Sequence, residues 1–82
     1  MAPSDTVVLY NLGNRLSIIC SNQILSALVM QQLAEKKLTD TKSNLKAVVG
    51  AVRDLELSQK YFEWLAENGD RMKVNFSCFI AY

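Results

Sequence analysis

Histidine is absent from this sequence, and cysteine, proline and glycine are scarce, with two cysteines, one proline and three glycines in 82 residues. Without histidine, the usual general base near neutral pH is missing. Gly13, Gly50 and Gly69 stand far apart, so the sequence contains no phosphate-binding glycine loop. The acidic residues are spread along polar stretches, with no nucleophile motif beside them. These absences predict a protein that is not an enzyme and that acts by binding.

The two cysteines, Cys20 and Cys78, are too few and too far apart for a zinc site in one chain. A structural zinc ion takes about four ligands, and these usually come in closely spaced pairs. We expect both thiols to be reduced and buried, as is usual inside cells. We therefore expect no metal and no other cofactor.

The sequence also lacks a long hydrophobic run. Its most apolar stretch, residues 16–30, is interrupted by serine, asparagine and glutamine. It is also shorter than the roughly 20 apolar residues that span a bilayer. The first residues carry an acid, Asp5, and no basic residue, so they do not form a secretory signal. We expect no membrane span and a cytoplasmic location.

The apolar content is high enough for one small core, at 50% of the residues. A chain of this size nevertheless buries only about 60% of the surface that it exposes when unfolded. Where metals and disulfides are lacking, pairing of two copies commonly supplies the missing core. We expect a single domain over residues 1–82 that forms a homodimer.

A long amphipathic helix is expected over about residues 41–68. Apolar side chains recur there at spacings of three and four, which is typical of one face of an α-helix. Thr39 or Asp40 is suited to cap its start, and Gly69 is suited to follow its end. Gly50 weakens such a helix by up to about 1 kcal/mol, but it allows a partner backbone to approach. At about 40 Å, this helix is longer than one small core, which again favours a dimer.

The first half of the sequence fits two structures. As a helix over about residues 5–37, it places its leucines on a face that continues into the next turns. As strands, residues 6–10 and 16–20 flank a turn-like segment, and their many β-branched residues favour this hairpin. We favour the helix because its apolar face is continuous. Residues 22–37 are helical in both interpretations.

The last residues have a different pattern. Apolar and polar residues alternate over about residues 72–81, which is the period of a β-strand. A single strand needs a partner. That partner is either the same strand of a second copy or the N-terminal hairpin, if the hairpin forms.

Four basic side chains gather on the outer face of the expected long helix. At about 100° per residue, they fall within about 40° of one another and opposite the apolar stripe. They are Lys42, Lys46, Arg53 and Lys60. Such a row suits the repeated phosphates of a nucleic acid, and duplex RNA in particular is recognised by its shape and backbone. A charged face is also what any solvated helix has, and Glu56 with Lys60 is an ordinary pair.

The chain resembles the small RNA-silencing suppressors of insect nodaviruses over about residues 3–69. The matching features are Pro3-Ser4, Leu12-Gly13-Asn14-Arg15-Leu16, Leu45-Lys46 followed by Arg53, Trp64-Leu65 and Gly69. In the second feature, those proteins have leucine, proline, aspartate, arginine and isoleucine. The strand expected over residues 72–81 lies outside the resemblance.

The resemblance implies a mainly α fold, in which a long helical hairpin pairs into an antiparallel, dimeric four-helix bundle. The implied dimer core consists of Leu45, Val48, Val52, Leu55, Phe62, Leu16 and Ile19. The implied function is sequence-independent binding of double-stranded RNA, which shields the duplex from host processing and so suppresses silencing. The resemblance implies Lys46 and Arg53 as RNA-binding residues, with Lys60, Lys37 and Arg15 as further candidates, and the basic row on the helix adds Lys42. A host silencing protein is a further candidate partner.

The alternative is an α+β interaction module. Here a β-hairpin and the C-terminal strand form a sheet behind two helices. Leu57, Tyr61 and Trp64 would then bind another protein. Aromatic residues near a helix end also often pack beneath a neighbouring segment, so this patch is a second hypothesis beside the RNA site.

Overall fold

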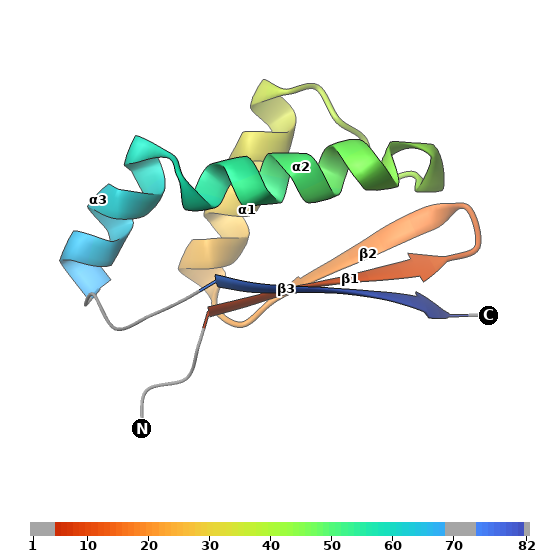
Figure 1. Ribbon diagram of the computed structural model, residues 1–82, viewed down its shortest axis with the longest axis horizontal. Helices are drawn as coiled ribbons and strands as arrows, with labels where there is room; N and C mark the ends of the chain where they lie inside the picture. The colour runs from red at the N-terminus through yellow and green to blue at the C-terminus, as the bar shows by residue number, and fades with distance from the viewer. Residues whose placement is uncertain (1–4, 69–73, 82) are drawn as a thin grey trace.

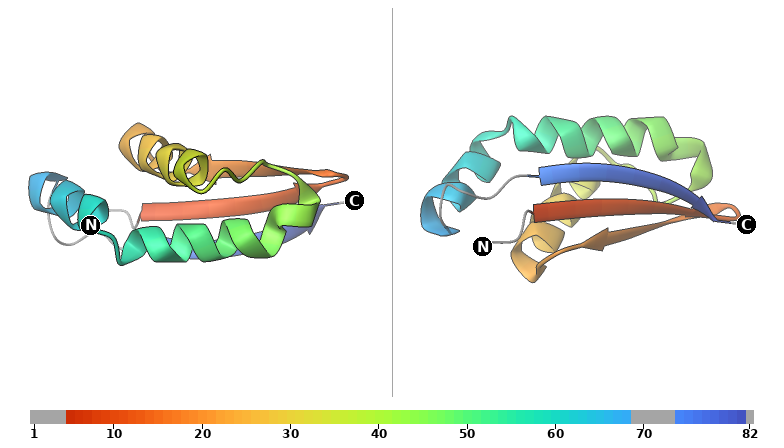
Figure 2. Two further views of the ribbon diagram at one scale, coloured as in Figure 1. Left: turned by 90° about the horizontal axis from the view of Figure 1, so that it is seen from above. Right: turned by 60° about the horizontal axis from the view of Figure 1, so that its bottom comes forward.

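The computed structural model describes residues 5–68 and 74–81, which form a three-stranded sheet with helices on one side (Figure 1; Figure 2). The strands are β1 (Asp5–Leu12), β2 (Arg15–Cys20) and β3 (Val74–Ala81). The helices are α1 (Gln23–Glu35), the 3-10 turn η1 (Lys42–Asn44), α2 (Leu45–Glu56) and α3 (Gln59–Asn68). The fold is α+β, so the expected helical hairpin and four-helix bundle are wrong.

The hairpin of β1 and β2 turns through Gly13 and Asn14. Its antiparallel register runs without a bulge from the Val7–Cys20 pair to the Leu12–Arg15 pair. Gly13 has a φ of 62°. A positive φ at the first of two loop residues is the pattern of a type II′ turn, which matches the twist of the strands. Glycine adopts this φ without a Cβ clash.

The helix expected over residues 5–37 is therefore wrong in its first half. In β1, Val7 and Leu9 are buried beneath the helices, while Val8 and Tyr10 stay partly exposed. Successive side chains of a strand point to opposite faces. β-Branched residues pack well on such a half-buried surface. This preference outweighed the continuous leucine face on which the helix interpretation rested.

α1 is fixed at both ends by local hydrogen bonds. Asn22 accepts a backbone N–H bond from the first turn at 2.7 Å, as an N-cap does. At the other end, Lys37 N–H donates to Ala34 O at 3.1 Å. Leu38 N–H donates to Leu33 O at 2.9 Å. These two bonds form a Schellman motif, which places Lys37 in the left-handed region at a φ of 54°.

The helix expected over residues 41–68 is divided into η1, α2 and α3. The break between α2 and α3 lies at Ser58, whose hydroxyl donates to Leu55 O at 2.7 Å. The hydroxyl oxygen of Ser58 in turn accepts a hydrogen bond from Tyr61 N–H at 3.2 Å. Serine thus closes one helix and caps the next. Apolar spacing alone predicted one helix here because both shorter helices keep the same period.

β3 lies beside β1 and runs parallel to it, from the Asp5–Val74 pair to the Leu12–Ala81 pair. The strand order β2-β1-β3 makes β1 the central strand. Parallel neighbours need a long connection, and the helical segment supplies it. β3 lies within the strand expected over residues 72–81, of which residues 72 and 73 fall outside the described part.

The core lies between the sheet and the helices. Its buried apolar members are Val7, Leu9, Leu16, Leu25, Val29, Leu33, Val48, Ala51, Val52, Leu55, Tyr61 and Trp64. Burying a valine or leucine side chain contributes about 1.5–3 kcal/mol. Since all of these residues belong to one chain, the chain encloses an apolar core by itself. The apolar face of this helical segment is covered by its own chain and does not need a second copy to cover it.

Candidate functional site

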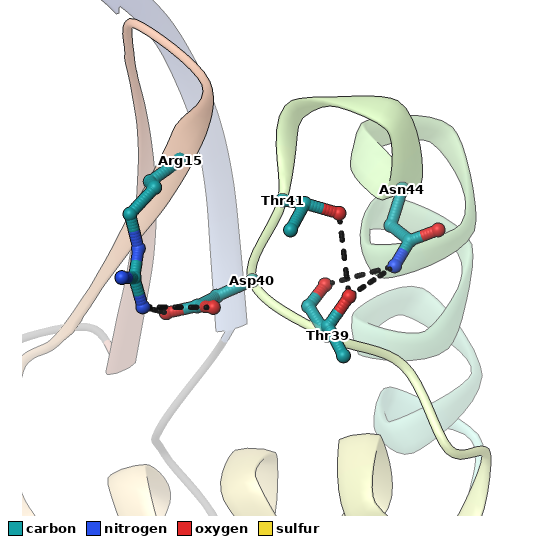
Figure 3. Close-up of polar contacts among 5 residues, drawn as sticks. All are labelled: Arg15, Thr39, Asp40, Thr41 and Asn44. Carbon is teal, nitrogen blue, oxygen red and sulfur yellow. Dashed lines mark hydrogen bonds and ion pairs between the residues drawn. The ribbon is translucent and has the colours of Figure 1, made fainter.

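Two of the six basic residues expected to bind RNA are neutralised within the chain. Lys60 on α3 forms an ion pair with Glu35 at the end of α1. Arg15 at the start of β2 pairs with Asp40, at 3.3 Å between Nη2 and Oδ2 (Figure 3). Because the helix is interrupted at Ser58, Lys60 faces α1 and does not continue the row of basic residues on α2. Neither residue is a strong candidate for phosphate contact.

The other four basic residues form no ion pair with any residue that the structure describes. Lys42, Lys46 and Arg53 are exposed and form no ion pair with any residue in the ranges 5–68 and 74–81. Lys37 is also exposed, but it lies on the turn after α1, away from these three. The structure therefore retains part of the expected basic row and removes the rest.

We call Lys42, Lys46, Gly50 and Arg53 the α2 ridge. The side of α2 opposite this ridge is buried, through Val48, Ala51, Val52 and Leu55. Arg53 follows Lys46 by two helical turns, roughly 10 Å along the axis. Glu56 is the nearest acidic residue along α2 that is not ion-paired, and it forms no bond with Arg53. The ridge therefore carries a net positive charge.

Gly50 lies on the ridge between Lys46 and Arg53. Glycine in a helix interior costs about 1 kcal/mol relative to alanine. Within residues 5–68 and 74–81, nothing lies within 4 Å of the place that a Cβ would take at this position. Packing among these described residues therefore does not require glycine here. A small residue between two free cations leaves the helix backbone open to close approach by a ligand.

The alternative patch of Leu57, Tyr61 and Trp64 does not form. Tyr61 is 2% exposed and Trp64 is 6% exposed, whereas Leu57 is 77% exposed. The two aromatic rings stack at 5.4 Å between centroids, with 23° between their planes. Stacked, buried rings of this kind stabilise a core. The structure thus places both aromatics in the core and separates them from Leu57.

Some of the residues expected in a dimer core are buried within the single chain, and others are exposed. Leu16, Val48, Val52 and Leu55 are buried in the core of the single chain, and Leu45 packs against it. Phe62 is 53% exposed and Ile19 is 52% exposed. The reason is that the sheet takes the position that a second helical hairpin would have taken. Of these seven residues, Phe62 and Ile19 keep the most apolar surface exposed for a partner.

A cleft of about 620 Å³ lies at the outer edge of the sheet, between β2, α1 and the loop after α1. We call it the β2 cleft. Its apolar walls include Leu16, Ile18, Met30, Leu33, Ala34 and Leu38. Arg15 and Asp40 line one end and form the ion pair described above. No sequence pattern predicted this cleft, because it depends on how the loop at Asp40 meets β2.

No protein-family model matches this sequence, and no solved structure matches the chain. Within the described ranges, no helix combines the length and the apolar character needed to cross a membrane.

Proposed function

We propose that this protein binds double-stranded RNA through the α2 ridge, without preference for base sequence. Lys42, Lys46 and Arg53 would contact phosphate oxygens, while the backbone at Gly50 lies close to the ribose-phosphate chain. Contacts of this kind fix the position of a protein on a duplex but carry no sequence information. Each phosphate that is neutralised releases counterions, so the affinity depends on salt.

The observation that carries the proposal is a destabilising glycine that packing among the described residues does not require, placed between two cations that form no ion pair with those residues. A second copy of the chain is a poor occupant of this ridge. It would bring Lys46 and Arg53 against cations of the same kind, and like charges in contact cost several kcal/mol. An anionic ligand is attracted instead.

A duplex suits the ridge better than a single strand. Proteins that hold single strands usually stack bases on exposed aromatic rings. The ridge has no aromatic residue, since Tyr61 and Trp64 are buried. A-form RNA presents a wide, shallow minor groove with its 2′-hydroxyls, which a helix face can follow. The choice of RNA over DNA rests on the resemblance to the nodavirus suppressors.

The biological role follows from the same resemblance. We propose that the bound protein shields duplex RNA from processing in the cytoplasm of a host cell. We also propose that the protein acts as a homodimer, which would present the ridge twice. Protection of a duplex from an RNase III enzyme tests the first statement. A sedimentation mass of about twice 9.2 kDa tests the second.

The sharpest test is Gly50→Ala. Alanine should raise the free energy of unfolding by about 1 kcal/mol, because it is the better helix former. The same methyl group should weaken binding to a labelled duplex RNA, as measured by fluorescence anisotropy. A variant that is more stable and yet binds more weakly separates a ligand site from a structural defect. Unchanged affinity in the stabilised variant would remove the proposed approach of RNA at Gly50.

A charge-matched comparison tests the cations. The double variant Lys46→Ala/Arg53→Ala should lower the log–log salt slope by about 2, or about 1 per lost phosphate contact. Its control is Lys36→Ala/Lys60→Ala, which removes the same net charge from two residues that are ion-paired within the chain. Equal losses in both variants would show that only net charge matters, and the ridge would not be the site.

A further inference from the structure

The β2 cleft contains backbone groups at a strand edge that are open to a new partner. In an antiparallel pair, the residues of one strand point their N–H and C=O groups alternately toward and away from the neighbouring strand. The Ser21 N–H bond to Thr6 O fixes this alternation for β2. It directs the N–H and C=O groups of Leu16 and Ile18 away from β1. These groups face the edge of the sheet.

The loop after α1 already uses part of this edge. Leu16 N–H donates to Asp40 O at 2.8 Å, and Lys42 N–H donates to Asn14 O at 2.9 Å. Arg15 and Thr41 form an isolated antiparallel bridge between these two bonds. The loop thus lies against the start of β2 as a short added strand.

The part of the loop that precedes Asp40 makes no backbone hydrogen bond with β2, so the next backbone groups of β2 have no partner among the described residues. Asn44 fixes the loop in this position, because its side-chain amide donates to Thr39 O at 3.1 Å (Figure 3). Among the described residues, none bonds the carbonyl of Leu16 or either backbone group of Ile18. In order along this edge, β2 therefore offers Leu16 C=O as an acceptor, Ile18 N–H as a donor and Ile18 C=O as a second acceptor.

We infer that the β2 cleft binds an extended, uncharged, apolar polypeptide segment of another protein as an added antiparallel strand. Addition of a strand to an exposed edge is a common mode of peptide recognition, with backbone bonds for affinity and side-chain seats for specificity. The segment should be uncharged, because Arg15 and Asp40, which are the charged residues among the described residues that line the cleft, neutralise each other. A charged side chain would be desolvated there without a partner.

The register also assigns an anchor residue in the segment. The residue opposite Ile18 would exchange two backbone bonds with it, and the segment would end short of Asp40, which already lies opposite Leu16. Side chains of directly paired residues share a face of the sheet. The anchor side chain therefore lies on the helix side, against Met30, Leu33 and Ala34. A leucine, isoleucine or methionine suits this apolar seat.

The probes for the test are short, acetylated and amidated fluorescent peptides of alternating threonine and valine, with leucine, isoleucine or methionine at the centre. Fluorescence anisotropy measures binding, and amide hydrogen exchange measures protection of Ile18 N–H. At least one peptide should bind and slow exchange at Ile18. Aspartate at the central position, or N-methylation of the central residue, should abolish both effects. Failure of every apolar peptide to bind at about 1 mM would overturn the inference.

Two matched variants locate the site. Ala34 and Ala27 are both exposed on α1, but only Ala34 lines the cleft. Ala34→Arg should weaken peptide binding by about tenfold or more, whereas Ala27→Arg should not change it. Equal binding by both variants would place the peptide elsewhere. Concentration-dependent protection of Ile18 without peptide would mean that a second copy of the chain occupies the edge, which also overturns the inference. Duplex-RNA binding should be unaffected, since the cleft and the α2 ridge share no residue.

Discussion

Lys37→Gly should stabilise the protein, because Lys37 holds a left-handed conformation that suits glycine. Its φ is 54°, and it is the only non-glycine residue with a positive φ among those described. For a residue with a Cβ, this conformation costs about 1–2 kcal/mol. Glycine removes that cost, but it adds about 0.5–1 kcal/mol of unfolded-state entropy. The Lys37 side chain is exposed and forms no ion pair with a described residue, so little else is lost.

The net gain lies between about 0 and 1.5 kcal/mol, and its midpoint of about 0.75 kcal/mol corresponds to a rise in Tm of about 3–6 °C for a domain of this size. Urea denaturation followed by circular dichroism measures it. The control is Lys37→Ala, which removes the same charge and side chain but keeps the Cβ, so it should gain no stability. If Lys37→Gly were less stable than Lys37→Ala, then Lys37 would not occupy the left-handed position of the Schellman motif.

Three further predictions concern the helix break, the core and the thiol. Ser58→Ala should lower the free energy of unfolding by about 1 kcal/mol, because α3 loses its N-cap bond to Tyr61 N–H; urea denaturation should detect this, and no change would mean that Ser58 is not the cap. Leu25→Ala should lower the free energy of unfolding by about 2–5 kcal/mol, because this side chain is fully buried. Leu57→Ala should lower it by less than about 0.5 kcal/mol, because Leu57 is 77% exposed. Similar losses for the two variants in thermal unfolding would show that Leu25 does not lie in the core. Burial raises the pKa of Cys20 above its ordinary value of 9.0, an effect that a hydrogen bond with Ser26 partly offsets. The folded state therefore favours the neutral thiol, and this contribution to stability is complete below pH 9.0 and is lost as the pH rises through the raised pKa. Alkylation of Cys20 near pH 8, followed by peptide mass spectrometry, should be slower in the folded than in the unfolded protein; equal rates would rule out the shift.

Local features of the sequence determined local features of the structure. Asn22 caps α1 and Gly13 turns the hairpin, because each acts through its own backbone and its nearest neighbours. The alternation near the C-terminus indicated a strand, and β3 forms there. The outward position of Lys46 and Arg53 also followed from the helical period, since both lie within α2.

The tertiary structure decided what the local patterns left open. Residues 5–20 fit a helix and a hairpin, and the hairpin formed with β1 paired on both sides, between β2 and β3. Lys60 shared a helical face with Lys46 in a continuous helix, but the turn at Ser58 sends it to Glu35 instead. Pairing of a strand, and the contact between two distant charges, depend on residues far apart in the sequence. No periodicity within one segment can record them, so the β2 cleft and the reduced α2 ridge emerged only with the fold.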